Sequence, residues 1–137
     1  MIETQRHKGT ETNTDNQPSY KVIGAAIEVH RTLGGPGLLE GVYEAALCHE
    51  LTLQGLKVQS QVSVPVRYKG VLVRDPLLID ILVEDHLVIE VKATEKDFPI
   101  YQVQLLTYLR LMNLRLGLLI NFGCQHIKDG VKRIING

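Results

Sequence analysis

The spacing of hydrophobic residues along the chain predicts two helices followed by a change to strands. From Ser19 to about Gly34, apolar residues recur every three or four positions, which predicts an amphipathic helix. The segment Gly34-Gly35-Pro36-Gly37 ends this helix. A second helix is predicted from about 38 to 54, with Gly55 suited to its C-terminal cap.

From Val58 the hydrophobic period falls to two, which is typical of strands. One long, half-exposed strand is predicted over 58–69, where Pro65 indicates an edge position or a bulge. Gly70 turns the chain into a third strand region over 71–83, interrupted near Asp75-Pro76.

The remaining chain predicts a buried parallel pair of strands joined by a helix. A very apolar strand is expected over 87–93 and a helix from about 99 to 113. The nearly continuous apolar run 115–122 predicts a central strand, parallel to the 87–93 strand through a right-handed crossover. Residues 131–135 are predicted to form a last short strand.

The predicted order is α-α-β-β-β-α-β, followed by the last short strand, which indicates an α/β protein with a mixed sheet flanked by helices. We expect one domain over 18–137, preceded by a polar, disordered tail over 1–17. The 137 residues suffice for one domain with its own core.

Composition narrows the functional classes only slightly. Fifteen basic and fifteen acidic residues give a net charge of zero, so no overall electrostatic attraction to nucleic acid is expected. We expect no membrane segment, because no apolar run is long enough to span a bilayer. The two cysteines form no disulfide framework, which favours a cytoplasmic location.

Three charged residues stand out because they lie inside very apolar strands. They are Asp80 in Leu77–Val83, and Glu90 and Lys92 in Leu87–Ala93. Glu90 and Lys92 point to the same side of their strand, because side chains alternate faces. A buried carboxylate costs several kcal/mol unless it is paired or holds a metal. Two acids and a lysine in adjacent strands therefore suggest a hard-cation site with a lysine beside it.

The turn between the two strands decides whether the acids meet. A three-residue loop at 84–86 would pair Val83 with Leu87 and put Asp80 opposite Glu90. A two-residue loop would put Asp80 opposite Val91, on the wrong face of the sheet. We expect the first arrangement, or a bulge that has the same effect.

Two pairs of polar residues occupy matching faces of the predicted helices. Glu40 and Tyr43 lie three apart near the start of the second helix, and Gln104 and Tyr108 lie four apart on the later helix. Gln104 interrupts an otherwise apolar stripe, and a buried amide needs a partner. We therefore expect the later helix to pack over the sheet face that carries Glu90 and Lys92.

These motifs, in this order, resemble a known family of nucleases. Gly37 to Tyr43 is similar to the G-x-x-E-x-x-Y signature of the GxxExxY family, which belongs to the PD-(D/E)XK nuclease superfamily. Asp80, Glu90-x-Lys92 and Gln104-x-x-x-Tyr108 resemble the superfamily pattern D…E-x-K…Q-x-x-x-Y, although Ile79 replaces the proline that commonly precedes the aspartate. The resemblance covers about residues 20–136 and implies a restriction-endonuclease-like core.

The resemblance implies a magnesium-dependent or manganese-dependent site. Asp80 and Glu90 would be metal ligands, with the Val91 carbonyl as a further candidate, and Lys92 would position the attacking water. Gln104 and Tyr108 would support the lysine and the scissile phosphate, and Glu40 would approach the metal or its water. A histidine near the site in some members makes His30 a further candidate metal ligand, since it flanks the same glycine-rich turn as Glu40.

Simpler interpretations remain for each of these residues. Glu90 and Lys92 could form a solvated ion pair on an exposed sheet face. His30 could be a core histidine with a satisfied hydrogen bond, and Tyr43 and Tyr108 could be core residues with bonded hydroxyls. Other features are weaker: Cys48-His49 and Cys124-x-His126 lack a known zinc spacing, and the basic cluster of Lys128, Lys132 and Arg133 could contact phosphates or only face solvent.

Two functions are compatible with the sequence. The first is a magnesium-dependent nuclease that hydrolyses phosphodiester bonds in DNA, favoured by the complete Asp-Glu-Lys set. The second is a non-catalytic module that keeps the nuclease fold and acts through self-association or a partner protein, favoured by the neutral net charge. Because the core is small, we expect a homodimer or a partner protein to help hold a DNA duplex.

Overall fold

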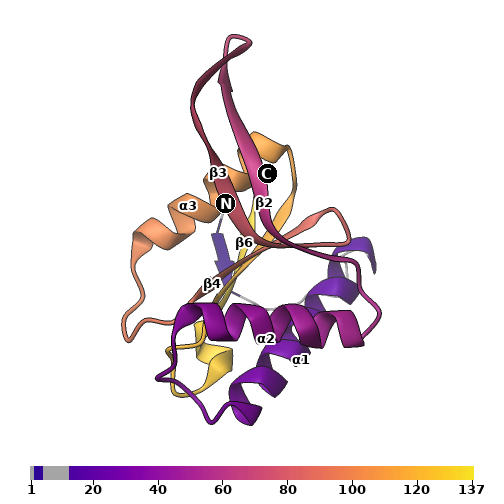
Figure 1. Ribbon diagram of the computed structural model, residues 1–137, viewed down its shortest axis with the longest axis vertical. Helices are drawn as coiled ribbons and strands as arrows, with labels where there is room; N and C mark the ends of the chain where they lie inside the picture. The colour runs from indigo at the N-terminus through magenta and orange to yellow at the C-terminus, as the bar shows by residue number, and fades with distance from the viewer. Residues whose placement is uncertain (1, 5–12) are drawn as a thin grey trace.

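The computed structural model describes residues 2–4 and 13–137, which form three layers. A mixed sheet lies in the middle, with helices α1 and α2 on one face and α3 on the other (Figure 1). The helices and strands are α1 (Asn13–Thr32), α2 (Glu40–Leu53), α3 (Pro99–Met112), a 3-10 helix η1 (Ile127–Gly130), β1 (Ile2–Thr4), β2 (Val58–Tyr68), β3 (Val71–Val83), β4 (Leu87–Lys92), β5 (Leu116–Asn121) and β6 (Val131–Ile135). The predicted fold class is therefore confirmed.

The sheet of the described residues has six strands in the order β1-β6-β5-β4-β3-β2. β4 and β5 are parallel, and every other neighbouring pair is antiparallel. All six residues of β5 are buried, as the continuous apolar run predicted for a central strand. In the described part of the chain, no helix is both long and apolar enough to cross a membrane.

The N-terminal region differs from the sequence prediction. Helix α1 begins at Asn13, six residues before the predicted start, and β1 pairs with β6 through Ile2↔Ile134. Of the expected tail over 1–17, residues 2–4 lie in β1 and 13–17 in α1, while residues 1 and 5–12 lie outside the described residues. The polar residues that open α1 carry no apolar periodicity, and a three-residue edge strand depends on a partner far away in sequence.

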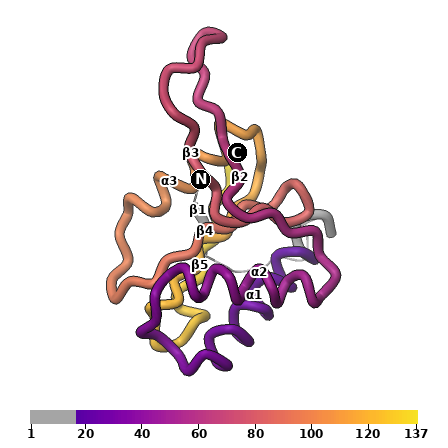
Figure 2. Tube along the Cα trace, in the orientation of Figure 1, coloured from indigo at the N-terminus to yellow at the C-terminus, as the bar shows by residue number. Residues whose placement is uncertain are grey.

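β2 and β3 form a long hairpin that extends beyond the rest of the sheet (Figures 1 and 2). Its two-residue turn, Lys69 and Gly70, has φ of 49° and 79°, the left-handed backbone of a type I′ turn. The ladder shifts between Val64↔Leu77 and Val66↔Arg74. Two residues of β3 there face Pro65 of the edge strand β2, so both the edge position and the bulge predicted from Pro65 are confirmed.

The turn between β3 and β4 has the predicted three residues. Val83 pairs with Leu87, and Glu84 and Asp85 adopt left-handed backbone with φ of 53° and 63°. Lys57 stabilises this geometry, because its N–H donates to the Glu84 carboxylate (2.6 Å) and its carbonyl accepts the Glu84 N–H (2.9 Å). The register that brings Asp80 and Glu90 together is therefore fixed by the turn.

The hydroxyl of Tyr43 holds the connection between α1 and α2. It donates a hydrogen bond to the Gly35 carbonyl (2.7 Å) and accepts one from the Leu38 N–H (3.1 Å). The fully buried ring stacks on Phe122, with ring centroids 4.7 Å apart. Tyr43 is thus a core residue with a bonded hydroxyl, and it determines where α2, and with it Glu40, begins.

We predict that Tyr43→Phe lowers the free energy of unfolding by about 1–3 kcal/mol, because it leaves two backbone groups without their partner while keeping the ring. Urea denaturation measures the loss. Tyr20→Phe, which alters an exposed tyrosine, is the control and should cost far less. Equal stability of the wild type and Tyr43→Phe would show that the hydroxyl does not fix the connection.

Candidate metal centre

The side chains of Asp80 and Glu90 each accept a backbone N–H of the opposite strand, across the gap between β3 and β4. The Asp80 N–H donates to Glu90 Oε1 (3.1 Å), and the Val91 N–H donates to Asp80 Oδ2 (2.9 Å). The backbone ladder between these strands covers Ile81, Leu82 and Val83 of β3. The two carboxylates therefore take over the hydrogen bonds of the sheet at the point where its backbone pairing stops.

β3 twists at Asp80. Ile79 packs in the hydrophobic core beneath α3, whereas Ile81 packs in the core beneath α1 and α2. Residues two apart in a regular strand share one face, so the strand must rotate between them. The rotation brings Asp80 within electrostatic reach of groups from both helical layers, including Glu40 on α2 and Tyr108 on α3.

Glu90 is the more buried of the two acids, with 2 % of its surface exposed. Burial, and then the negative charge of Asp80, raise the pKa of Glu90 to about 8. Lys92 and the Asp80 N–H favour the charged form but do not offset burial. The alternative of a solvated ion pair on an exposed face is therefore wrong for Glu90.

Lys92 and the polar residues of α3 line one surface pocket. Its walls include Lys92, Tyr101, Gln104 and Tyr108, and the Lys92 ammonium lies over the Tyr101 ring, 4.7 Å from its centroid. Gln104 also forms a side-chain hydrogen bond with Tyr108. Helix α3 thus packs over the face that carries Glu90 and Lys92, as the amide in its apolar stripe predicted.

Helix α2 brings two further acids within electrostatic reach of Asp80. Burial raises the pKa of Glu40, against the attraction of Lys92 and with the repulsion of Asp80. Burial also raises the pKa of Glu44, which accepts a hydrogen bond of 2.7 Å from Gln61 Nε2. We did not predict Glu44 or Gln61 from the sequence, although Glu44 lies one helical turn after Glu40.

The structure does not bring His30 to the acids in any contact that it describes. His30 is 7 % exposed, its Nε2 donates to the Cys124 carbonyl (2.9 Å), and its ring lies 6.3 Å from that of Phe122. Because a carbonyl only accepts hydrogen bonds, Nε2 carries the proton. His30 therefore matches the simpler interpretation of a core histidine with a satisfied hydrogen bond.

Asn121, another residue that the sequence analysis missed, fixes the chain just after Lys92. Its Oδ1 accepts the N–H groups of Thr94 (3.0 Å) and Gly123 (2.9 Å), and its Nδ2 donates to the Thr94 carbonyl (3.0 Å). The Phe122 N–H donates to the Lys92 carbonyl (2.7 Å). These bonds hold the end of β4 against β5. The signal available in the sequence was the single amide of Asn121 inside the apolar run 115–122.

The candidate metal centre offers two carboxylates to a cation. Within residues 2–4 and 13–137, no three acidic, histidine or cysteine side chains converge closely enough to hold an ion, which also gives no support to zinc at Cys48 or Cys124. Asp80 and Glu90 nonetheless supply hard oxygen donors, and their mutual repulsion is what a cation between them would relieve. The pair fits a divalent cation completed by water or substrate oxygens.

Comparison with known proteins agrees with this arrangement. A family model described as PD-(D/E)XK nuclease superfamily matches residues 16–134. The chain belongs to the PD-(D/E)XK nuclease superfamily. No curated protein and no solved structure matches the chain. Membership of this nuclease superfamily supports a hydrolytic, nucleic-acid-directed function and the usual use of divalent metal ions.

The raised pKa of Glu90 predicts a pH-dependent effect of Glu90→Gln on the metal-free protein. Unfolded Glu90 ionises near its ordinary pKa of 4.5, whereas the native side chain holds its proton until about pH 8. The native state therefore binds more protons in this window, so its stability falls as pH rises from about 4.5 to about 8. Glutamine removes the titration.

Urea denaturation in EDTA at pH 5 and pH 8 measures the effect. Relative to the wild type, Glu90→Gln should gain on the order of a few kcal/mol at pH 8 compared with pH 5. The exposed control Glu95→Gln should show no such change. A difference between the wild type and Glu90→Gln that is the same at both pH values would contradict the assignment.

Proposed function

We propose that the protein is a metal-dependent nuclease that hydrolyses phosphodiester bonds in DNA. The observation that carries the proposal is the pairing of half-buried Asp80 with buried Glu90 at the end of the β3–β4 ladder, with Lys92 on the same strand as Glu90. Superfamily membership supports the class of reaction.

In this proposal Asp80 and Glu90 hold a magnesium or manganese ion, with the Val91 carbonyl as a further candidate ligand. When bound, such an ion lowers the pKa of its water and stabilises negative charge on the phosphate. Each carboxylate also keeps one oxygen on a backbone N–H, which fixes its orientation before substrate arrives.

The neighbouring residues act on the water and the phosphate. Lys92 orients the attacking water and balances charge that develops in the transition state. Tyr101 supports the lysine through the contact of its ring with the ammonium, and Gln104 and Tyr108 support the lysine and the scissile phosphate from α3. Glu40 is assigned to the water rather than to the metal. His30 is assigned to anchoring the loop after β5, not to metal binding.

We also place the chain in the GxxExxY family, because both Glu40 and Tyr43 of that signature have a role in this structure. Glu40 is an acid beside Lys92, and the Tyr43 hydroxyl fixes the start of α2. We propose a cytoplasmic location, in keeping with the free thiols of Cys48 and Cys124. We also propose a homodimer or a partner protein that helps to hold the duplex.

A second candidate function is a non-catalytic module that keeps the nuclease fold. The observation that favours it is that Asp80 and Glu90 already satisfy backbone N–H groups, so the pair could serve only to complete the sheet. A purified wild-type protein that cuts no nucleic acid with magnesium or manganese would favour this module over the nuclease.

Metal binding should stabilise the native state, because a ligand that binds only that state raises its stability by mass action. At a metal concentration about ten times the Kd, the gain is about 1.4 kcal/mol, which raises Tm by a few degrees. Thermal unfolding with magnesium or manganese measures the shift. Asp80→Asn should remove the shift, and the exposed control Asp129→Asn should keep it. An undiminished rise in Tm in Asp80→Asn would show that the metal binds elsewhere.

Lys92→Ala should lower the rate of DNA cleavage by at least about 100-fold, because the lysine acts on the water and the transition state. DNA affinity should change far less. Gel assays of single- and double-stranded DNA with magnesium or manganese measure the rates. Glu40→Ala should slow cleavage less than Lys92→Ala does, and the exposed control Lys21→Ala should cleave normally. An unchanged cleavage rate in Lys92→Ala would contradict this mechanism.

A further inference from the structure

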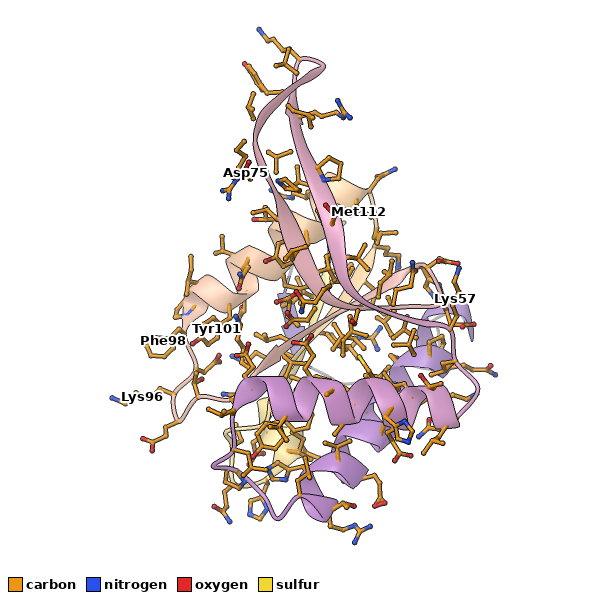
Figure 3. All side chains as sticks on the ribbon, in the orientation of Figure 1. Lys57, Asp75, Lys96, Phe98, Tyr101 and Met112 are labelled. Carbon is orange, nitrogen blue, oxygen red and sulfur yellow. The ribbon has the colours of Figure 1, made fainter. Side chains whose placement is uncertain are left out.

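The outer part of the β2–β3 hairpin is an unpartnered ribbon of two strands. We call residues 66–76 the ribbon; it projects away from the three layers, and Asp75 marks it in Figure 3. Outside the β2–β3 ladder, β3 pairs with β4 only through Ile81–Val83, so the described strands leave the outer edge of the ribbon open. A long open edge normally needs a cover or a partner.

The side chains of the ribbon are apolar and exposed to an unusual degree. Tyr68, Val71, Leu72 and Val73 are 64, 62, 57 and 53 % exposed, and they are nearly consecutive. Single exposed apolar residues need no explanation, but a contiguous group marks an interaction surface. The ribbon therefore has the composition of a binding element rather than of a solvated loop.

The ribbon is also positively charged, although the chain as a whole is neutral. Residues 66–76 contain three cations, Arg67, Lys69 and Arg74, and one acid, Asp75. Lys69 lies over the Tyr68 ring at 5.4 Å, and Arg74 Nε donates to the Asp75 carbonyl at 3.0 Å. None of the ion pairs described for the structured residues involves these three cations. Their charge is available to a partner with phosphates.

The ribbon grows from the same strand that carries Asp80. Val71 lies nine positions before Asp80, a length on the order of 30 Å in an extended strand and close to the roughly 34 Å of one turn of duplex DNA. A duplex whose backbone meets Asp80 and Glu90 could therefore run beside the ribbon for about one turn.

We propose that the ribbon is a DNA-binding arm that enters a groove of double-stranded DNA next to the bond to be cut. A two-stranded ribbon fits the major groove of B-form DNA, whereas the deep, narrow major groove of an RNA duplex excludes it. Arg67, Lys69 and Arg74 contact phosphates, and the apolar tip packs against sugars and base edges. The inference rests on the proposed function and deepens it, since it names duplex DNA as the substrate.

Fluorescence anisotropy in EDTA tests the arm separately from catalysis. The probe is a labelled mixed-sequence DNA duplex of about 25 base pairs, compared with its single strand and with an RNA duplex of the same sequence. The triple variant Arg67→Ala, Lys69→Ala, Arg74→Ala should bind the DNA duplex at least about tenfold more weakly near 0.1 M salt. The slope of log K against log salt should fall by about 2.7, or 0.9 for each lost phosphate contact.

The matched control removes two cations of α1, which lies away from the ribbon. Lys21→Ala with Arg31→Ala is compared with Lys69→Ala with Arg74→Ala, which changes the net charge equally. The α1 variant should leave both affinity and slope near the wild-type values. If the ribbon triple variant fails to fold, Lys69→Glu alone provides the test, because Lys69 lies in the exposed turn. Lys69→Glu should weaken duplex binding, whereas the control Lys21→Glu should leave it near the wild-type value.

Three results would overturn the proposal that the ribbon binds DNA. The first is equal DNA binding by the ribbon and control variants, and the second is equal affinity of the wild type for the DNA duplex and for either other probe. The third is a wild-type dimer that the double variant Leu72→Ser, Val73→Ser dissociates without loss of DNA binding. The last result would make the ribbon a contact between copies of the chain. Ribbon-dependent duplex binding without any cleavage would instead support the arm and reject the proposed nuclease, so the two failures are distinguishable.

Discussion

The structure depends on placing two carboxylates inside a sheet without leaving its backbone groups unpaired. Asp80 and Glu90 meet this constraint because each carboxylate accepts a hydrogen bond from a backbone N–H on the opposite strand. The bonds compensate for the loss of regular pairing beyond Ile81. They do not remove the repulsion between the acids, which together with burial raises the pKa of Glu90 to about 8. Glu90 therefore keeps its proton until about pH 8, and ionising it without a cation costs free energy at this one point of the sheet.

That point also organises the rest of the molecule. The twist of β3 at Asp80 sends Ile79 and Ile81 into opposite cores, so both helical layers reach the same gap. Helix α2 contributes Glu40 from one face of the sheet, and α3 contributes Gln104 and Tyr108 from the other. Beyond the gap, β3 no longer pairs with β4 and continues into the ribbon. The candidate metal centre and the proposed arm are therefore consecutive parts of one strand, and the position of one fixes the position of the other.

Much of this arrangement could be predicted from the sequence, because local patterns determine it. The three-residue turn placed Asp80 opposite Glu90, and the amide of Gln104 indicated which sheet face α3 covers. Other features depend on contacts between distant segments. Glu44 matters because Gln61 and Asp80 lie beside it, and Asn121 matters because Thr94 does. His30 was placed near the metal from its position beside the glycine-rich turn, whereas its described hydrogen bond is to Cys124, 94 residues away. Sequence periodicity carries no information about such partners.

The chemical identity of Asp80 and Glu90 weighs against a purely structural role for the pair. Asparagine and glutamine carry an oxygen at the same position and would accept the same two N–H donors without charge. Carboxylates add repulsion and a large desolvation cost, visible in the raised pKa of Glu90, and gain nothing in the hydrogen bonds that amides could not largely supply. The negative charge becomes favourable once a divalent cation lies between the two side chains, because the repulsion then turns into attraction to the ion. The physical argument therefore favours a metal site over a structural pair, and the presence of Lys92 on the same strand favours one that acts on phosphate.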